Sequence, residues 1–239
     1  MLDCIEVDGL IKFYGSFKAL DGLTFSIRCG EKVALLGPNG AGKTTTLRIL
    51  AGLLRPNEGI VKIKGFNISK NPREAKSNIG FLPEDAVPFL NLTVRENLEY
   101  VGILRNINNL KERINHLLDV LELWEYERKT VSSLSRGNRQ KVALAMAIIH
   151  EPAILLLDEP LNYLDIPTQE RVINLLNSMN STMLVSTHIM SIAERLTNKI
   201  ILITKGKVIW QGGMTELKKL AGENERIEQV VARLIGDSL

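Results

Sequence analysis

The chain has 239 residues, of which 45% are hydrophobic and 24% charged, so it can form a substantial core and lacks the composition of a disordered protein. Its formal net charge of +3 is spread along the sequence, without the block of Lys or Arg that would indicate a nucleic-acid-binding arm. The sequence has no apolar run of about 18 residues, which a membrane-spanning helix requires, and no basic and apolar signal segment at its start. We therefore expect a soluble protein of the cytoplasm.

The first 63 residues alternate short apolar runs with turns that contain glycine. Runs such as residues 25–28 and 60–63 are rich in β-branched and aromatic residues, which predicts strands, some of them antiparallel. Cys4 and Cys29 are too few for a disulfide framework and lack the spacing of metal ligands. We expect them to be small buried thiols in a reducing compartment.

A phosphate-binding loop lies among these strands. The apolar run 33–36 leads into the pattern G-x-x-x-x-G-K-[ST], and a helical stretch follows it. Gly40 and Gly42 permit backbone conformations that a Cβ would prevent, so that amide N–H groups can point at phosphate oxygens. Lys43 would supply a cation for the β- and γ-phosphates, and the Thr44 hydroxyl could ligate Mg²⁺. The residues predicted to bind a nucleoside triphosphate are Gly37, Pro38, Asn39, Gly40, Ala41, Gly42, Lys43, Thr44 and Thr45.

From about residue 92 to residue 150 the spacing of apolar residues becomes helical. Thr93 followed by Glu96 is typical of a capping box, which predicts a helix that begins there. The apolar face of this helix is expected to carry Leu98, Val101 and Leu104. Further helices are predicted over residues 110–123 and 139–149.

After residue 153, apolar runs at 154–157, 182–186 and 200–203 alternate with helical sequence. Short apolar strands separated by helices predict a mostly parallel sheet covered on both faces. We therefore predict a single domain over residues 1–239 with an α/β fold. Residues 1–84 and 151–239 would form a P-loop NTPase core with N-terminal antiparallel strands, and residues 85–150 an inserted helical subdomain.

Two acids end the first of these later strands. Asp158, at the carboxyl end of a buried strand, is suitably placed to hold Mg²⁺ next to Thr44. Glu159 follows where the chain leaves the sheet, and it can act as general base for a water that attacks the γ-phosphate. Two solvated carboxylates at a turn would produce the same sequence. The phosphate loop favours the metal site, because a triphosphate site needs a metal-holding acid from a neighbouring strand.

Residues 134–140, Leu-Ser-Arg-Gly-Asn-Arg-Gln, resemble the L-S-G-G-Q signature of ATP-binding cassette (ABC) proteins in the variant form L-S-x-G-x-x-Q. Leu164 and Asp165 match the D-loop of that family, His188 its switch histidine, and Tyr14 the aromatic residue that stacks on adenine. The matches occur in the family's order over about the first 215 residues. The chain thus resembles the nucleotide-binding subunit of an ABC transporter, most like the exporter branch.

This resemblance implies an ATPase that converts ATP and water to ADP and phosphate, with Glu159, His188 and Lys43 as catalytic residues. Ser135 and Gly137 would contact the ATP held by a second nucleotide-binding subunit, so that a head-to-tail dimer, here a homodimer, encloses two ATP molecules. Three simpler interpretations remain open. Ser135 could be only a helix N-cap, Tyr14 a core aromatic, and His188 a structural histidine that caps the next helix.

The resemblance also implies membrane-spanning permease subunits that dock around residues 81–92 and hold the chain at the inner face of the cell membrane. No nucleic-acid partner is expected. One position departs from the family pattern, because Glu84 stands where these proteins usually carry a Gln whose amide oxygen approaches Mg²⁺. A carboxylate can also ligate Mg²⁺. Glu84 could alternatively be a solvated acid that contributes only to docking.

Other classes of nucleotide-binding protein fit less well. A GTPase would carry Asn-Lys-x-Asp, but residues 198–201 lack the acid and lead into a strand. A small-molecule kinase would not explain residues 134–140 or His188. A soluble ABC ATPase that acts on ribosomes or DNA is the closest alternative, although such proteins usually carry two cassettes or a long coiled-coil insertion.

Overall fold

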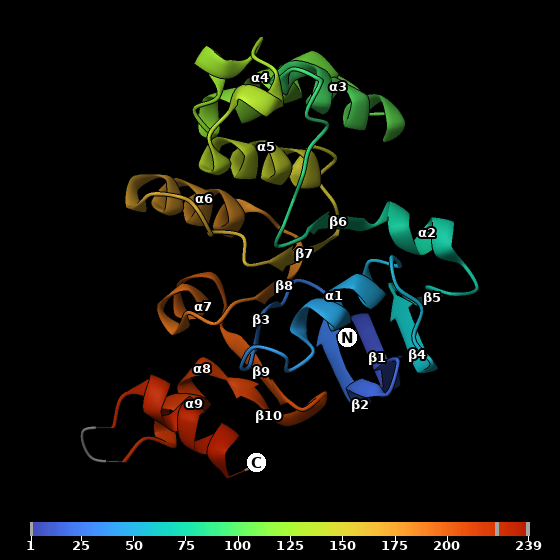
Figure 1. The fold of residues 1–239 in the computed structure, drawn as a ribbon, viewed down its shortest axis with the longest axis vertical. Coiled ribbons are helices and arrows are strands. Elements are labelled where there is room, and N and C mark those ends of the chain that lie inside the picture. The colour runs from blue at the N-terminus through green and yellow to red at the C-terminus, as the bar shows by residue number, and fades with distance from the viewer. Residues whose placement is uncertain (1, 223–224, 238–239) are drawn as a thin grey trace.

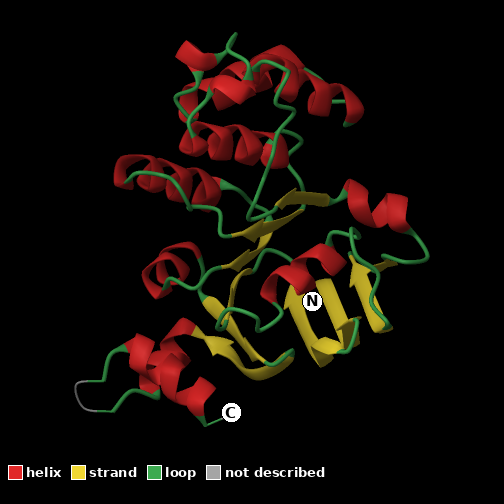
Figure 2. Ribbon diagram, in the orientation of Figure 1, coloured by secondary structure: helices red, strands yellow, loops and turns green. Residues whose placement is uncertain are grey.

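The computed structural model describes residues 2–222 and 225–237. Its strands are β1 (Asp3–Tyr14), β2 (Phe17–Arg28), β3 (Lys32–Leu36), β4 (Glu58–Ile63), β5 (Phe66–Asn67), β6 (Ile79–Leu82), β7 (Ile154–Asp158), β8 (Thr182–Ser186), β9 (Lys199–Thr204) and β10 (Lys207–Gly213). They form a four-stranded antiparallel sheet, β2-β1-β4-β5, and a six-stranded sheet, β10-β9-β3-β8-β7-β6 (Figure 2). In the larger sheet only β10 runs antiparallel to its neighbour. The predicted α/β fold is confirmed.

The α-helices are α1 (Lys43–Leu50), α2 (Pro72–Ser77), α3 (Val94–Leu104), α4 (Leu110–Val120), α5 (Arg136–Ile148), α6 (Ile166–Ser178), α7 (Met190–Leu196), α8 (Met214–Lys219) and α9 (Ile227–Gly236). Short 3₁₀ turns occur at Trp124–Tyr126 and Val131–Ser133. Figure 1 shows α3, α4 and α5 together at one end of the molecule and α8 and α9 at the other. Each helix in the described part of the chain is too short or too polar to cross a membrane.

Alternate residues of the larger sheet face two different layers. Val33 and Leu35 of β3 belong to a buried cluster with α1 and the antiparallel sheet, so α1 lies between the two sheets. Ala34 and Leu36 point to the opposite face, where α7, α8 and α9 cover them. Because both faces of the sheet are buried, the sequences of its strands are continuous apolar runs. This packing fixes the carboxyl ends of β3 and β7, where the phosphate loop and the two acids lie.

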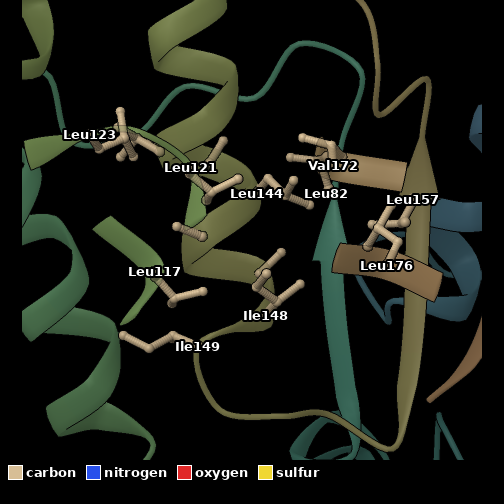
Figure 3. Close-up of a cluster of buried hydrophobic side chains, with 14 of the residues drawn as sticks. Leu82, Leu117, Leu121, Leu123, Leu144, Ile148, Ile149, Leu157, Val172 and Leu176 are labelled. Carbon is tan, nitrogen blue, oxygen red and sulfur yellow. The ribbon is translucent and has the colours of Figure 1, made fainter. Parts of the chain in front are cut away.

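The helices α3, α4 and α5 share one hydrophobic core with the larger sheet. The cluster joins Leu117 of α4 and Leu144 of α5 to Leu82 of β6 and Leu157 of β7, with Leu176 of α6 beside them (Figure 3). At about 25 cal/mol per Å² of buried apolar surface, such a continuous core strongly disfavours separation of the layers. The start of α5 is therefore held in a fixed position relative to the end of β7.

Side-chain N-caps fix where α3 and α5 begin. The Thr93 side chain accepts a hydrogen bond from the backbone N–H of Glu96, and the Glu96 carboxylate accepts one from the Thr93 N–H, so the predicted capping box is confirmed. The prediction for Leu104 is wrong. Leu98 is buried, but Leu104 is 63% exposed, because it lies on the last turn of α3 beyond the covered face. Helix α5 begins at Arg136 rather than Arg139, since Ser135 Oγ caps it by accepting from the Asn138 N–H.

The prediction for the cysteines is also wrong. Cys4 and Cys29 form a disulfide rather than two free thiols. Strands β1 and β2 are antiparallel, with Asp3 opposite Arg28 and an irregular register between Asp3 and Ile5, and the two cysteines lie beside this pair with a Cα–Cα distance of 4.8 Å. That distance lies in the range a disulfide requires. A separation of 25 residues in the sequence gives no sign of it.

Candidate functional site

The phosphate loop connects β3 to α1 and has the backbone geometry that its glycines predict. Gly40 has φ +80° and Gly42 has φ +104°, in the left-handed region that favours glycine. A Cβ at Gly42 would lie 2.9 Å from the Ala19 carbonyl oxygen, so only glycine fits there. Gly42 is the N-cap of α1, and the first residues of that helix line the pocket, where a helix N-terminus favours an anion.

Lys43 is folded against its own loop. Its ammonium donates to the carbonyl oxygens of Gly37 at 2.7 Å and Pro38 at 3.1 Å. Burial lowers the pKa of Lys43, although three nearby carboxylates oppose this change. These carboxylates belong to Glu159, Asp158 and Glu84. Lys43 lines the pocket, and pairing with phosphate oxygens would replace its two hydrogen bonds to the loop.

Asp158 ends β7 and is only 1% exposed. Its Oδ1 accepts a hydrogen bond from Ser186 Oγ at 2.6 Å, while its Oδ2 is buried and has no hydrogen-bond partner among the described residues. A buried carboxylate oxygen without a partner is costly unless a cation or donor approaches it. Three carboxylates face one ammonium in this pocket, so a divalent cation fits the charge that the residues present. The described residues hold no cluster of three or more His, Cys, Asp or Glu suited to a metal. Thr44, whose hydroxyl is the oxygen ligand predicted from the sequence, lines the same pocket.

Glu159 is held by the residues that follow β8. Its Oε1 accepts from the backbone N–H of His188 at 3.1 Å and lies 2.7 Å from His188 Nδ1. Its Oε2 accepts from Thr187 Oγ1 at 3.1 Å. Because an ionised carboxylate only accepts, Nδ1 carries the proton in the contact with His188. Glu159 also has φ +46°, an unusual conformation for a residue with a side chain, of the kind that occurs at functional sites.

Glu84 lies on the loop after β6 and joins the same pocket. Burial raises the pKa of Glu84, and the negative charges of Asp158 and Glu159 raise it further, while Lys43 acts in the opposite direction. Glu84 is an exposed residue at the rim of this pocket, and its carboxyl lies close enough to Asp158 and Glu159 for their charges to raise its pKa. Glu84 as a metal ligand and Glu84 as an acid with only a docking role therefore both stay predictions.

The two groups of predicted site residues line different pockets. One pocket of about 440 Å³ contains Tyr14, the phosphate loop, Glu84, Asp158, Glu159 and His188. Ser135 and Gly137 instead line a separate pocket of about 840 Å³ together with Asp165. Tyr14 is exposed at the end of β1 rather than part of the core. Tyr14 therefore lines the phosphate-loop pocket from the surface, and Ser135 and Gly137 line a different pocket of the same chain.

The structure adds residues that the sequence analysis missed. Phe17, exposed beside Tyr14, gives the pocket a second aromatic side chain. Ser186 and Thr187 orient Asp158 and Glu159 through their hydroxyl groups. The signal for these two residues was available, because a hydroxyl at the end of a strand next to β7 lies at the same sheet edge as the acids.

Comparisons with known proteins identify the family of the chain. A model of the ABC transporter family matches residues 20–162. The ABC transporter ATP-binding protein NatA of Bacillus subtilis is 39% identical over 219 residues, which cover 89% of this chain and 87% of that protein. The bacitracin transport ATP-binding protein BcrA of Bacillus licheniformis is 37% identical over 223 residues, which cover 92% of this chain and 72% of that protein.

A solved structure has the same fold. This dimeric ATP-binding cassette in a post-hydrolysis state, bound to ADP and Pi, has a TM-score of 0.81 and 29% identity, over 88% of this chain and 98% of the other. The family match spans more than half of this chain, and it includes both the phosphate loop and the Asp158–Glu159 pair. The chain therefore belongs to the ABC transporter family, as an ATP-binding and ATP-hydrolysing subunit.

Proposed function

We propose that two copies of this chain close head to tail around two ATP molecules and that hydrolysis separates them, which powers export through membrane-spanning partners. The observation that carries this proposal is the division of the site into two pockets. Residues for the triphosphate, metal and attacking water surround the phosphate loop, whereas Ser135 and Gly137 line a different pocket of the same chain. A second copy would bring its Ser135–Gly137 helix end to the open side of the phosphate-loop pocket.

Each side chain then has a defined role. Lys43 pairs with the β- and γ-phosphates, Tyr14 stacks on the adenine, and Thr44, Asp158 and Glu84 hold Mg²⁺. The cation neutralises phosphate charge when it is bound. Glu159 accepts a proton from the attacking water, while His188 and Thr187 hold its carboxylate in place. The γ-phosphate contributes contacts to both subunits only before cleavage, so its loss removes the bias toward the closed dimer.

The loop after β6 supports the proposed docking of a permease. Val87, Phe89 and Leu90 on this loop are exposed, as are Ile103 and Leu104 of α3. An apolar pocket of about 380 Å³ lies between this loop, α3 and α5. Exposed apolar groups gathered in this way are typical of a protein–protein contact. We propose that the permease seats here and holds the subunit at the inner face of the membrane, with residues 85–150 acting as the helical subdomain.

The direction of transport rests on a relative. The Nod factor export ATP-binding protein I of Ralstonia nicotianae, 37% identical over 219 residues, is by its name an export protein, which favours export for this chain. We expect the chain, purified from detergent-solubilised native membranes, to co-purify with a polytopic membrane protein. Removal of the exposed apolar side chains of Val87 and Phe89 by substitution with Ser should reduce that recovery, while Ile60→Ser, also exposed but on β4, should not. Recovery with ribosomes or DNA instead would support the soluble ABC ATPase alternative.

The role of Glu84 can be tested by two substitutions. Glu84→Gln is expected to retain most ATPase activity, because the amide oxygen can still reach Mg²⁺. Glu84→Ala should lose much of the activity and need about tenfold more Mg²⁺ for half-maximal rate. Metal ligands must be deprotonated, and the pKa of Glu84 is raised by burial, so the wild-type requirement for Mg²⁺ should increase as the pH falls toward that raised pKa. Glu84→Gln should abolish this pH dependence.

The measurement is ATPase rate against Mg²⁺ concentration at several pH values. Glu74→Gln is the control, since it removes an exposed acid on α2 that is not among the residues of this pocket. An Ala variant with unchanged turnover and unchanged Mg²⁺ dependence would contradict the metal-binding role of Glu84.

A further inference from the structure

Arg136, the first residue of α5, contacts the segment that follows β7 and the segment that follows β6. Its guanidinium carbon lies 3.5 Å from the centroid of the Tyr163 ring, in the connection between β7 and α6. Its Nη2 lies 3.5 Å from Asp85 Oδ1, on the residue that follows Glu84. The Arg136 side chain thus connects the loop that carries Glu159, the proposed general base, to the loop that carries Glu84, a proposed metal ligand.

The connection from Glu159 to Asp165 depends on α5 for its conformation. Glu159 and Tyr163 both have left-handed backbones, with φ +46° and +67°, which persist only where the surroundings impose them. Residues of α5 close to Arg136 hold this connection in place. Gly137 packs so closely that a Cβ would lie 2.7 Å from the Tyr163 carbonyl oxygen, and Gln140 Nε2 donates to the Pro160 carbonyl at 3.3 Å.

The stack on Tyr163 matters more than the ion pair. Arg136 is 65% and Asp85 81% exposed, and an exposed ion pair contributes little. A planar guanidinium at 3.5 Å from an aromatic ring gains from both charge and stacking, which a lysine cannot reproduce. Arg136 also stands at a position where the L-S-G-G-Q signature has glycine, so this contact is a property of this chain rather than of the signature pattern.

We propose that Arg136 is a positioning residue for ATP hydrolysis, acting through Tyr163 to hold the loop that carries Glu159. The inference rests on the proposed function, since Ser135 and Gly137 beside Arg136 would face the ATP of the second copy. Binding of that triphosphate would displace the start of α5. Arg136 and Tyr163 would then move with it and shift Glu159, the general base of the same chain. The two sites would then be coupled, and the coupling is reciprocal.

The test is a double-mutant cycle read by steady-state ATPase kinetics. Arg136→Ala should lower kcat about tenfold or more, because small displacements of a reacting group have large effects, while KM for ATP changes by less than about twofold. It should also lower the Hill coefficient for ATP. Tyr163→Ala should give the same losses, and the double variant should lose no more than either single variant. Tyr163→Phe, which keeps the ring, should retain activity, and Arg136→Lys should not.

Lys129→Ala is the matched control, because it removes a cation 4.7 Å from the Tyr126 ring without touching the Glu159 loop. Unchanged kcat in Arg136→Ala, additive losses in the double variant, or full activity in Arg136→Lys would each overturn the proposal. Such results would leave the proposed function intact as long as a mixture of Lys43→Ala and Ser135→Arg still restores ATP hydrolysis. Absence of that recovery would instead point to failure of the proposed function itself.

Discussion

Replacement of Glu159 by Gln is expected to slow ATP hydrolysis by about 10²–10⁴-fold while ATP binding is retained. Gln has nearly the same shape and its Oε1 can still accept from the His188 N–H, so the loop should keep its conformation. The amide cannot take a proton from water at neutral pH, and the γ-phosphate therefore stays intact. An intact γ-phosphate keeps the contacts that favour the closed state, so this variant should accumulate as an ATP-bound dimer.

Two measurements check this expectation: the rate of phosphate release, and the mass of the ATP-bound variant by size exclusion with light scattering. Glu151→Gln is a suitable control, because Glu151 lies just before β7 with its side chain exposed, far along the strand from Asp158. Hydrolysis near the wild-type rate would remove Glu159 from the role of base. A monomer that fails to hydrolyse ATP would separate catalysis from dimerisation.

Ser135→Arg and Lys43→Ala are expected to impair different steps: dimerisation in the first variant and ATP binding in the second. Ser135 and Gly137 lie outside the phosphate-loop pocket, so Ser135→Arg should leave ATP affinity of the monomer unchanged but abolish ATP-dependent dimerisation and turnover. Lys43 is proposed to pair with the phosphates, and a charge-assisted hydrogen bond contributes about 1.5–3 kcal/mol. Lys43→Ala should therefore weaken ATP binding itself by about ten- to a hundredfold.

Equilibrium binding of a fluorescent ATP analogue at concentrations below dimerisation separates the two variants. Ser133→Arg provides the control for Ser135→Arg, since it adds the same side chain two residues earlier, at an exposed position before the helix begins. If Ser135→Arg destroyed binding by the monomer, residues 134–140 would belong to the pocket of their own chain and the head-to-tail arrangement would be wrong.

The parts of the site that could be predicted are those encoded by local sequence. The phosphate loop needs left-handed glycines before a helix, and Gly40 and Gly42 have that conformation. Asp158 follows an uninterrupted apolar run, and the carboxyl end of a buried parallel strand lies at the same edge as the loop. The capping box at Thr93 is likewise local, because its two hydrogen bonds join residues three positions apart.

The parts that could not be predicted depend on register and on contacts between distant segments. The pairing of Cys4 with Cys29 follows from the alignment of β1 against β2, which has several shifts in register. The stack of Arg136 on Tyr163 joins the start of α5 to a loop 27 positions later, and neither residue shows this in the sequence. Leu104 fits the helical period but lies where no other element covers α3, because burial is decided by tertiary packing.

The most direct test of the central claim is a mixture of two inactive variants. A dimer of Lys43→Ala with Ser135→Arg contains one intact composite site, formed by the phosphate loop of the second chain and the Ser135–Gly137 helix end of the first. The account predicts that mixing them restores ATP hydrolysis, whereas Lys43→Ala mixed with the Lys43→Ala/Ser135→Arg double variant restores none. Absence of recovery at every mixing ratio, with both chains folded, would contradict a site shared between two copies.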